Sequence, residues 1–170
     1  MDHKTRYLVL NSLMIALVCI TTMTIQIPMP GTNGYVNIGD SVIFITSILF
    51  GPMVGMVAGG IGSALADILT GYAHWAIFTL IIKGLEGYVV GIIIKNHSTV
   101  IKSLFATALG TITMVIGYFL AGIILKGNII ISAASIPGNL IQGIVCMAIA
   151  ILLSHSLAKV KYVKTFKAHS

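Results

Sequence analysis

Charged side chains are scarce in this sequence of 170 residues. Only 8% of the residues are charged and 57% are hydrophobic, whereas about a quarter of the residues in a soluble domain carry charge. This balance excludes an ordinary water-soluble fold and indicates an integral membrane protein. Six membrane helices of about 20 residues each would use about 120 of the 170 residues and leave room for short loops only. We therefore expect residues 1–170 to form a single transmembrane domain.

The sequence also lacks the motifs of nucleotide, metal and hydrolytic sites. Cys19 and Cys146 lie in separate apolar segments without a CxxC or Cys/His cluster, so we interpret them as packing residues. No Gly-x-x-x-x-Gly-Lys-Ser/Thr loop is present, and ATP-driven work would therefore need a partner protein. HExxH and GxSxG motifs are absent as well. We expect no catalytic residues, no cofactor and no metal site.

Six apolar segments stand out by their length and lack of charge. They cover residues 7–27, 41–50, 53–69, 75–94, 100–125 and 133–157. We predict an all-α integral membrane protein with six transmembrane helices, the first of which is a retained helix rather than a signal peptide. The second segment is short, since about 11 residues rise only about 16 Å as a helix. We expect it to start earlier, near Asn37, or to be tilted and shielded by neighbours.

The number of crossings depends on whether the second and third segments form one helix or two. Gly51-Pro52 favours a tight hairpin between two helices. Six crossings would place the N-terminus, the 95–102 loop and the Lys-rich C-terminus in the cytoplasm, with only Lys126 among the loop cations outside, whereas five would put the 95–102 loop outside. We therefore prefer six, with both termini cytoplasmic in a bacterial plasma membrane. The net charge of +6 then reflects topology, and we expect no nucleic-acid partner.

Ionisable residues inside the apolar segments mark a candidate functional site. Three of the four acidic residues, the only tryptophan and an isolated lysine fall between residues 37 and 86. Such groups are costly in hydrocarbon unless they have a partner or a water-filled cavity. In the third segment, a row of small residues at every fourth position ends at Asp67, which predicts close helix packing and an inward-facing carboxylate. The row consists of Gly51, Gly55, Gly59 and Ser63.

The fourth segment adds stacking, hydrogen-bonding and charged groups on one helical face. Lys83 lies about 13 Å below the outer end of this segment, where it could simply pair with Glu86 or with Asp67. Asp40 could likewise do no more than cap the second helix. The candidate substrate-binding residues are Asn37, Asp40, Asp67, His74, Trp75, Phe78, Lys83, Tyr118, Asn139 and Gln142.

Several motifs in the same window, together with the six-segment layout, resemble those of a known family. The motifs are Asn37-Ile38-Gly39-Asp40, Phe50-Gly51-Pro52 with the small-residue row to Ala66-Asp67, and Lys83-Gly84-Leu85-Glu86-Gly87. They resemble the substrate-binding S component of energy-coupling factor (ECF) vitamin transporters, over nearly the whole chain. The chain is most similar to the branch assigned to hydroxymethylpyrimidine or vitamin B6, and riboflavin-type members are also similar.

The resemblance implies a protein that captures a vitamin from outside and delivers it through a transmembrane T component carrying two cytosolic ATPases. In the family, an Ala-x-x-x-Ala motif on the first helix packs against the coupling protein. Ser12 and Ala16 match that motif, with serine in place of one alanine. The aromatic and polar candidates suit hydroxymethylpyrimidine and pyridoxine equally well. The alternatives are a riboflavin- or thiamine-type S component, a proton-coupled carrier using Asp67, Lys83 and Glu86, and a membrane enzyme.

Overall fold

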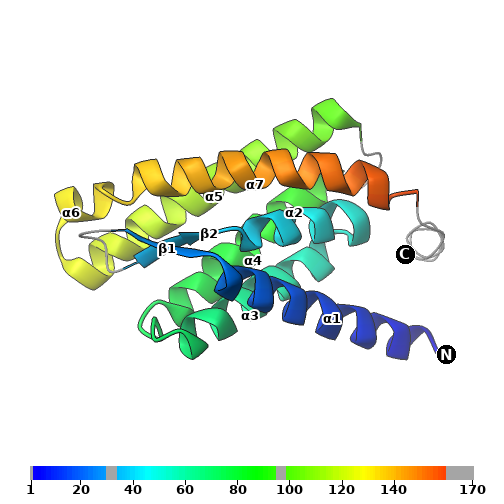
Figure 1. Cartoon of the computed structure of the whole chain (residues 1–170), viewed down its shortest axis with the longest axis horizontal. Helices are drawn as coiled ribbons and strands as arrows, with labels where there is room; N and C mark the ends of the chain where they lie inside the picture. The colour runs from blue at the N-terminus through cyan, green and yellow to red at the C-terminus, as the bar shows by residue number, and fades with distance from the viewer. Residues whose placement is uncertain (1, 30–33, 95–98, 160–170) are drawn as a thin grey trace.

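Helices make up almost all of the structure, a computed structural model that describes residues 2–29, 34–94 and 99–159 (Figure 1). The elements are α1 (His3–Thr24), β1 (Gln26–Met29), β2 (Gly34–Asn37), α2 (Gly39–Phe50), α3 (Pro52–Leu69), α4 (Ala76–Ile94), α5 (Val100–Lys126), α6 (Ile129–Ala133) and α7 (Ile136–Leu157). The six longest helices coincide with the six predicted segments to within a few residues. The prediction of an all-helical membrane fold is therefore confirmed, with one small exception.

The exception is a β-hairpin in the first predicted loop. Strands β1 and β2 pair in antiparallel fashion, with Gln26 opposite Asn37 and Met29 opposite Gly34. The predicted apolar segments end at residue 27 and resume at residue 41, so the sequence indicated only a connection here. Proline is tolerated on an edge strand such as β1. Residues 30–33 lie outside the described residues.

Five stretches of the described chain are long and apolar enough to cross a membrane, namely α1, α3, α4, α5 and the stretch from α6 to α7. Helix α2 has only 12 residues, but nine of them are buried. It packs against α1, α3, α4 and α7, so neighbouring helices shield it from lipid. It begins at Gly39, close to the earlier start expected from the sequence.

The turn between α2 and α3 follows the predicted hairpin signal. Gly51 has a φ of +91°, which is a left-handed conformation that suits glycine. Pro52 opens α3, where its missing N–H costs nothing. These two residues reverse the chain and prevent α2 and α3 from forming one continuous helix.

The small residues of α3 allow its backbone to approach α4 closely. A Cβ atom at Gly59 would lie 2.7 Å from the Lys83 carbonyl oxygen, and one at Gly60 would lie 2.7 Å from the Leu80 carbonyl oxygen. Both distances are too short for a side chain. The predicted close packing of the small-residue row is confirmed at Gly55 and Gly59, which approach backbone oxygens of α4, but not at Gly51, which has nothing within 4 Å of a Cβ position. This contact places Asp67 and Lys83 on two tightly packed helices.

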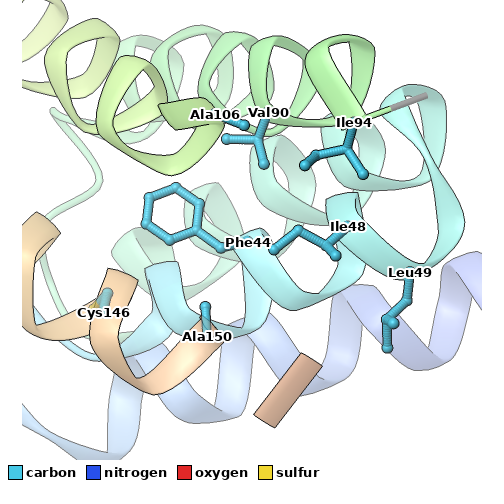
Figure 2. Close-up of a cluster of buried hydrophobic side chains, with 8 residues drawn as sticks. All are labelled: Phe44, Ile48, Leu49, Val90, Ile94, Ala106, Cys146 and Ala150. Carbon is cyan, nitrogen blue, oxygen red and sulfur yellow. The ribbon is translucent and has the colours of Figure 1, made fainter. Parts of the chain in front are cut away.

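The helices run roughly along the long axis of the molecule, so that their connections lie at its two ends (Figure 1). The hairpin, the α3–α4 turn and α6 lie at one end, which we call the hairpin end, and the start of α1 and the end of α7 lie at the other. Apolar packing fills the interior towards that opposite end, where Phe44 of α2 contacts Val90 of α4 and Cys146 of α7 within one cluster (Figure 2). Cys146 and Cys19 are both buried free thiols, in agreement with their predicted packing role.

Candidate functional site

A pocket lies at the hairpin end, between the hairpin and helices α1, α3, α4, α5 and α7. Its lining residues are Thr22, Met29, Gly34, Tyr35, Asn37, Ser63, Asp67, Trp75, Thr79, Lys83, Tyr118, Lys126, Ser135, Asn139 and Gln142. Its cavity volume is about 40 Å³, and about 540 Å³ of empty space is counted when the open mouth is included. The pocket is therefore narrow.

Seven of the ten predicted substrate-binding residues line this pocket, and three do not. Asp40 is buried below it, in contact with Lys83. His74 is exposed in the turn between α3 and α4, where its ring contacts Trp75 at a centroid distance of 6.0 Å. Phe78 is half-buried and packs against the apolar cluster that contains Trp75. Sequence spacing placed these residues near the site but did not give the direction of their side chains.

Three charged residues form a buried ion cluster, which consists of Asp40, Lys83 and Glu86. Lys83 Nζ lies 2.5 Å from Asp40 Oδ1 and 2.9 Å from Glu86 Oε2. All three side chains are no more than 2% exposed. The predicted Lys83–Glu86 pair is confirmed, whereas the alternative pairing of Lys83 with Asp67 is wrong, because Asp40 of α2 provides the second carboxylate.

Asp40 does not cap α2, contrary to the simpler of its two predicted roles. The N-cap of α2 is Ile38, which has no side-chain capping bond. The Asn37 side-chain oxygen instead accepts a hydrogen bond of 2.8 Å from the Gly39 amide. The Asp40 carboxylate is thus free to bind Lys83 and Gln142.

Gln142 of α7 connects the ion cluster to the hairpin. Its Nε2 donates to Asp40 Oδ2 at 2.6 Å, and its Oε1 accepts from the Asn37 backbone amide at 2.7 Å. Both ends of the Gln142 amide are therefore occupied by protein groups. This chain of bonds links β2, α7, α2 and α4 beneath the pocket.

Lys83 forms part of the pocket floor, but its ammonium group is already surrounded. Besides the two carboxylates, its Nζ contacts Met114 Sδ at 2.9 Å and lies 5.5 Å from the centre of the Tyr118 ring. An ammonium group has three N–H donors, and a thioether is a weak acceptor. Lys83 therefore serves mainly to neutralise Asp40 and Glu86.

Asp67 has a different environment on the pocket wall. Its Oδ1 accepts a hydrogen bond of 2.6 Å from the Tyr35 hydroxyl, whereas its Oδ2 is buried and has no hydrogen-bond donor in the described part of the chain. Burial and the neighbouring Asp67 carboxylate raise the pKa of Tyr35, so that Tyr35 remains a donor. Sequence reasoning missed Tyr35. The signal was available, since Tyr35 and Asn37 are two residues apart and share one face of a strand.

Aromatic rings and one cation complete the wall near the mouth. The rings of Trp75 and Tyr118 meet edge to face with centroids 5.9 Å apart, and Lys126 Nζ lies 5.6 Å from the Trp75 ring. The Tyr118 hydroxyl donates to Thr79 Oγ1 at 3.2 Å. These surfaces provide stacking area for a flat ligand together with polar edges.

The start of α7 supplies the remaining polar group. Asn139 is 4% exposed and lines the pocket. Its side chain makes no hydrogen bond to any described residue, whereas the nearby Ser135 hydroxyl donates to the Ser132 carbonyl. The site thus offers an amide, a carboxylate and aromatic rings, and among the described residues no cluster of His, Cys, Asp and Glu could hold a metal ion. Such a set of groups is suited to binding rather than to bond-breaking chemistry.

Comparison with known proteins gives a family match over most of the chain. The model of the family described as "ECF-type riboflavin transporter, S component" matches residues 2–159. A solved structure of the S component of a bacterial ECF transporter superposes with a TM-score of 0.71 at 26% identity, covering 92% of this chain and 97% of that one.

Individual relatives match this chain over different lengths. The thiamine precursor transporter HmpT of Lactococcus lactis subsp. cremoris is 28% identical over 172 residues, covering 98% of this chain and 97% of the relative. An uncharacterized protein of Pyrococcus woesei is 49% identical over 110 residues, covering 65% and 74%. A UPF0397 protein of Streptococcus pneumoniae serotype 19F is 40% identical over 81 residues. That match covers 48% of this chain and only 43% of the pneumococcal protein.

Proposed function

This chain belongs to the family of ECF-type riboflavin transporter S components, and we propose that its ligand is a small single-ring vitamin or precursor, hydroxymethylpyrimidine or pyridoxine. S components are substrate-binding subunits of vitamin transporters and not enzymes, so the chain is a multi-pass protein of the cell membrane that performs no chemistry. Residues 1–170 would act as one S-component domain. Because the chain belongs to this family, we no longer favour the alternative functions of a proton-coupled carrier or a membrane enzyme.

The observation that carries the choice of ligand is the narrow pocket with aromatic and polar walls. Pockets for drug-sized ligands measure about 300–1,000 Å³, and this one reaches about 540 Å³ only when its mouth is included. Trp75 and Tyr118 offer ring surfaces, and Asp67 and Asn139 offer polar groups. These dimensions favour one aromatic ring over the three fused rings of a flavin. The similarity to HmpT supports a thiamine precursor.

Riboflavin is the second candidate, because the matching family model carries that name. The Met29 side chain of the hairpin packs against the backbone of α7 at Gly138. We propose that a flavin would need these two segments to separate. We therefore consider riboflavin a less favoured ligand than the single-ring compounds.

We further propose six membrane crossings with both termini in the cytoplasm. Helix α2 is about 18 Å long at 1.5 Å per residue, which is short for a bilayer core of about 30 Å. Its burial among α1, α3, α4 and α7 would allow it to reach across within the protein. The cations at both ends of the sequence and near Lys102 support this orientation, and the pocket would then open to the outside.

The partners in this proposal are a transmembrane T component and two cytosolic ATPase subunits. Ser12 and Ala16 are exposed one turn apart on α1, and small residues at that spacing allow another helix to approach closely. We propose that the T component docks on this stripe. Ser12 and Ala16 precede the pocket-lining Thr22 on α1 by about 15 and 9 Å along the helix, so we propose that partner binding and ligand binding use different parts of α1.

Substitutions at Ser12 and Ala16 test whether partner binding and ligand binding are separate. The double variant Ser12→Leu/Ala16→Leu should keep its ligand affinity within about twofold but reduce ATP-dependent uptake by at least about tenfold, because two bulky side chains block helix approach. Uptake is measured in cells that supply the other subunits, and affinity is measured on the purified chain. Thr24→Leu, an exposed change at the other end of α1, is the control. Normal uptake by the double variant would remove the docking proposal.

The ligand itself is tested by mass spectrometry of any small molecule that copurifies, followed by titration. The purified chain is titrated with hydroxymethylpyrimidine, pyridoxine, thiamine and riboflavin. We expect tight binding of one of the first two, in unmodified form. Preferential binding of riboflavin or thiamine would overturn the single-ring proposal. Loss of uptake on collapse of the proton gradient, with ATP maintained, would instead revive the proton-coupled carrier.

A further inference from the structure

The ion cluster contains two acids but only one base. Asp40 and Glu86 both contact Lys83 Nζ, and none of the three side chains is more than 2% exposed. If both acids were ionised, one positive charge would face two negative charges inside the protein. An uncompensated charge is costly in such surroundings, and two carboxylates that share one site do not both ionise readily. The ion cluster therefore needs a second positive charge.

The described neighbours do not supply that charge. Lys83 is the only cation that pairs with either acid in the part of the chain that the structure describes. The thiol of Cys146 lies near Glu86 but donates to the Asn37 carbonyl instead. A metal ion would need about six oxygen ligands, and the described residues contain no group of three or more acids, histidines or cysteines that could hold one. The remaining candidate is a proton.

The hydrogen bonds indicate which acid would carry the proton. Asp40 Oδ1 accepts from Lys83, and Asp40 Oδ2 accepts from Gln142 Nε2 at 2.6 Å. Donors on both oxygens stabilise the ionised form of a carboxylic acid. Glu86 Oε2 accepts from Lys83 at 2.9 Å, whereas Glu86 Oε1 is buried and has no hydrogen-bond partner among the described residues. A proton can therefore bind Oε1 without breaking any of these bonds.

The side of Glu86 that faces α5 has apolar surroundings. A Cβ atom at Gly110 of α5 would lie 2.6 Å from Val90 Cγ2, 3.2 Å from Phe44 Cε1 and 3.6 Å from Glu86 Cγ. The Glu86 side chain thus lies against α5 next to the apolar cluster that contains Phe44 and Val90. A neutral carboxylic acid with an unpaired hydroxyl is less costly there than an unpaired carboxylate charge.

We propose that Glu86 is a buried proton site, in which Oε1 carries a proton and Lys83 balances the charge of Asp40. Lys83 and this proton together neutralise the ion cluster. The inference goes beyond the proposed function, because it requires no particular ligand. Since Glu86 does not line the pocket, the proton is a fixed part of the protein and is not exchanged when a ligand binds.

Infrared spectroscopy detects such a proton directly, because the carbonyl stretch of a neutral carboxylic acid lies apart from the bands of carboxylates and amides. The chain has only four acidic residues, and Glu86 is its only glutamate. Wild-type protein is produced with glutamate that carries a heavy carbon isotope at the side-chain carboxyl, and it is measured at neutral pH in a detergent without ester groups. We expect a carboxylic acid band that labelling shifts to lower frequency. The absence of such a band, or a band that labelling does not shift, would overturn the proposal.

Two variants separate Glu86 from Asp67, the other buried acid with an oxygen that has no hydrogen-bond partner among the described residues. Glu86→Gln should lose the carboxylic acid band of the wild type. Asp67→Asn, the matched change on α3, should retain it. The opposite pattern would place the proton on Asp67 and refute the assignment to Glu86. If Glu86→Gln fails to fold, the isotope shift in the wild-type protein still decides the question.

Ligand binding tests whether the proton is fixed. Binding of hydroxymethylpyrimidine is followed by the fluorescence of Trp75, which is the only tryptophan and lines the pocket. At saturation, the carboxylic acid band should keep its full intensity. Disappearance of the band on binding would show that the proton is exchanged, which contradicts a fixed site. If hydroxymethylpyrimidine does not bind, the proposed ligand fails, whereas the isotope measurement still tests the proton site.

Discussion

Two groups of buried polar residues lie next to each other in this protein, and they differ in whether their unpaired carboxylate oxygen belongs to a residue that lines the pocket. In the ion cluster, Lys83 holds both Asp40 and Glu86, and Gln142 takes the second oxygen of Asp40. On the pocket wall, Asp67 Oδ1 accepts from Tyr35, and Asp67 Oδ2 makes no hydrogen bond to the residues that the structure describes, although Thr79 lies beside the carboxylate. Both groups were costly to bury, but only the second leaves an acceptor for a ligand.

The difference separates a structural role from a binding role. The ion cluster joins α2 to α4, and through Gln142 it joins them to α7 and the hairpin. It therefore holds the walls of the pocket together from below. Glu86 Oε1 also has no hydrogen-bond partner among the described residues, but Glu86 does not line the pocket, so this oxygen does not face a ligand there.

Among the substitutions that test this comparison, removal of the Lys83 ammonium group should reduce the free energy of unfolding the most. Lys83→Met leaves two buried carboxylates without a cation, and breaking a buried ion pair costs about 3–5 kcal/mol. The measurement is the free energy of unfolding in a denaturant titration of the detergent-solubilised protein. Lys4→Met, at an exposed position in the first turns of α1, is the matched control. A stability equal to that of the wild type would show that the ion cluster does not hold the helices.

Replacement of Asp40 and of Asp67 by asparagine should lower the free energy of unfolding by different amounts. Both losses should be smaller than the loss caused by Lys83→Met. Asp40→Asn weakens the bonds to Lys83 and should cost about 1–3 kcal/mol of stability. Asp67→Asn keeps the bond from Tyr35 and should cost less than about 1 kcal/mol. Both variants are compared in the same unfolding assay. Equal losses of stability would mean that the distinction between ion cluster and pocket wall is false.

Much of the fold could be predicted from the sequence, because helix length and apolar runs are local properties. Gly51-Pro52 marked the turn that splits α2 from α3, and the small-residue row marked the α3–α4 contact. The hairpin could not be predicted, since Pro28 and the nearby glycines indicated a loop. Strand pairing depends on contacts between segments, and local composition does not show them.

The site was only partly predictable, for a related reason. Spacing on α4 placed Trp75 and Lys83 on one face, and both line the pocket. Spacing could not show that Asp40, 43 residues before Lys83 in the chain, supplies its second carboxylate. Nor could it show that Tyr35 approaches Asp67. Pairing across helices decides which charged groups are available to a ligand, and that pairing is a property of the folded chain.

His74 should show the smallest effect, although the sequence placed it among the candidates. Its side chain is exposed and does not line the pocket, and its ring contacts Trp75 only from the outside. His74→Ala should therefore change affinity for hydroxymethylpyrimidine by less than about twofold in the Trp75 fluorescence titration. Asn139→Ala in the same assay provides the contrast, since it removes a group that faces the pocket. If His74→Ala lowers the affinity by more than about fivefold, the binding site extends into the α3–α4 turn. In that case, an unpaired polar atom is not enough to recognise the groups that bind the ligand.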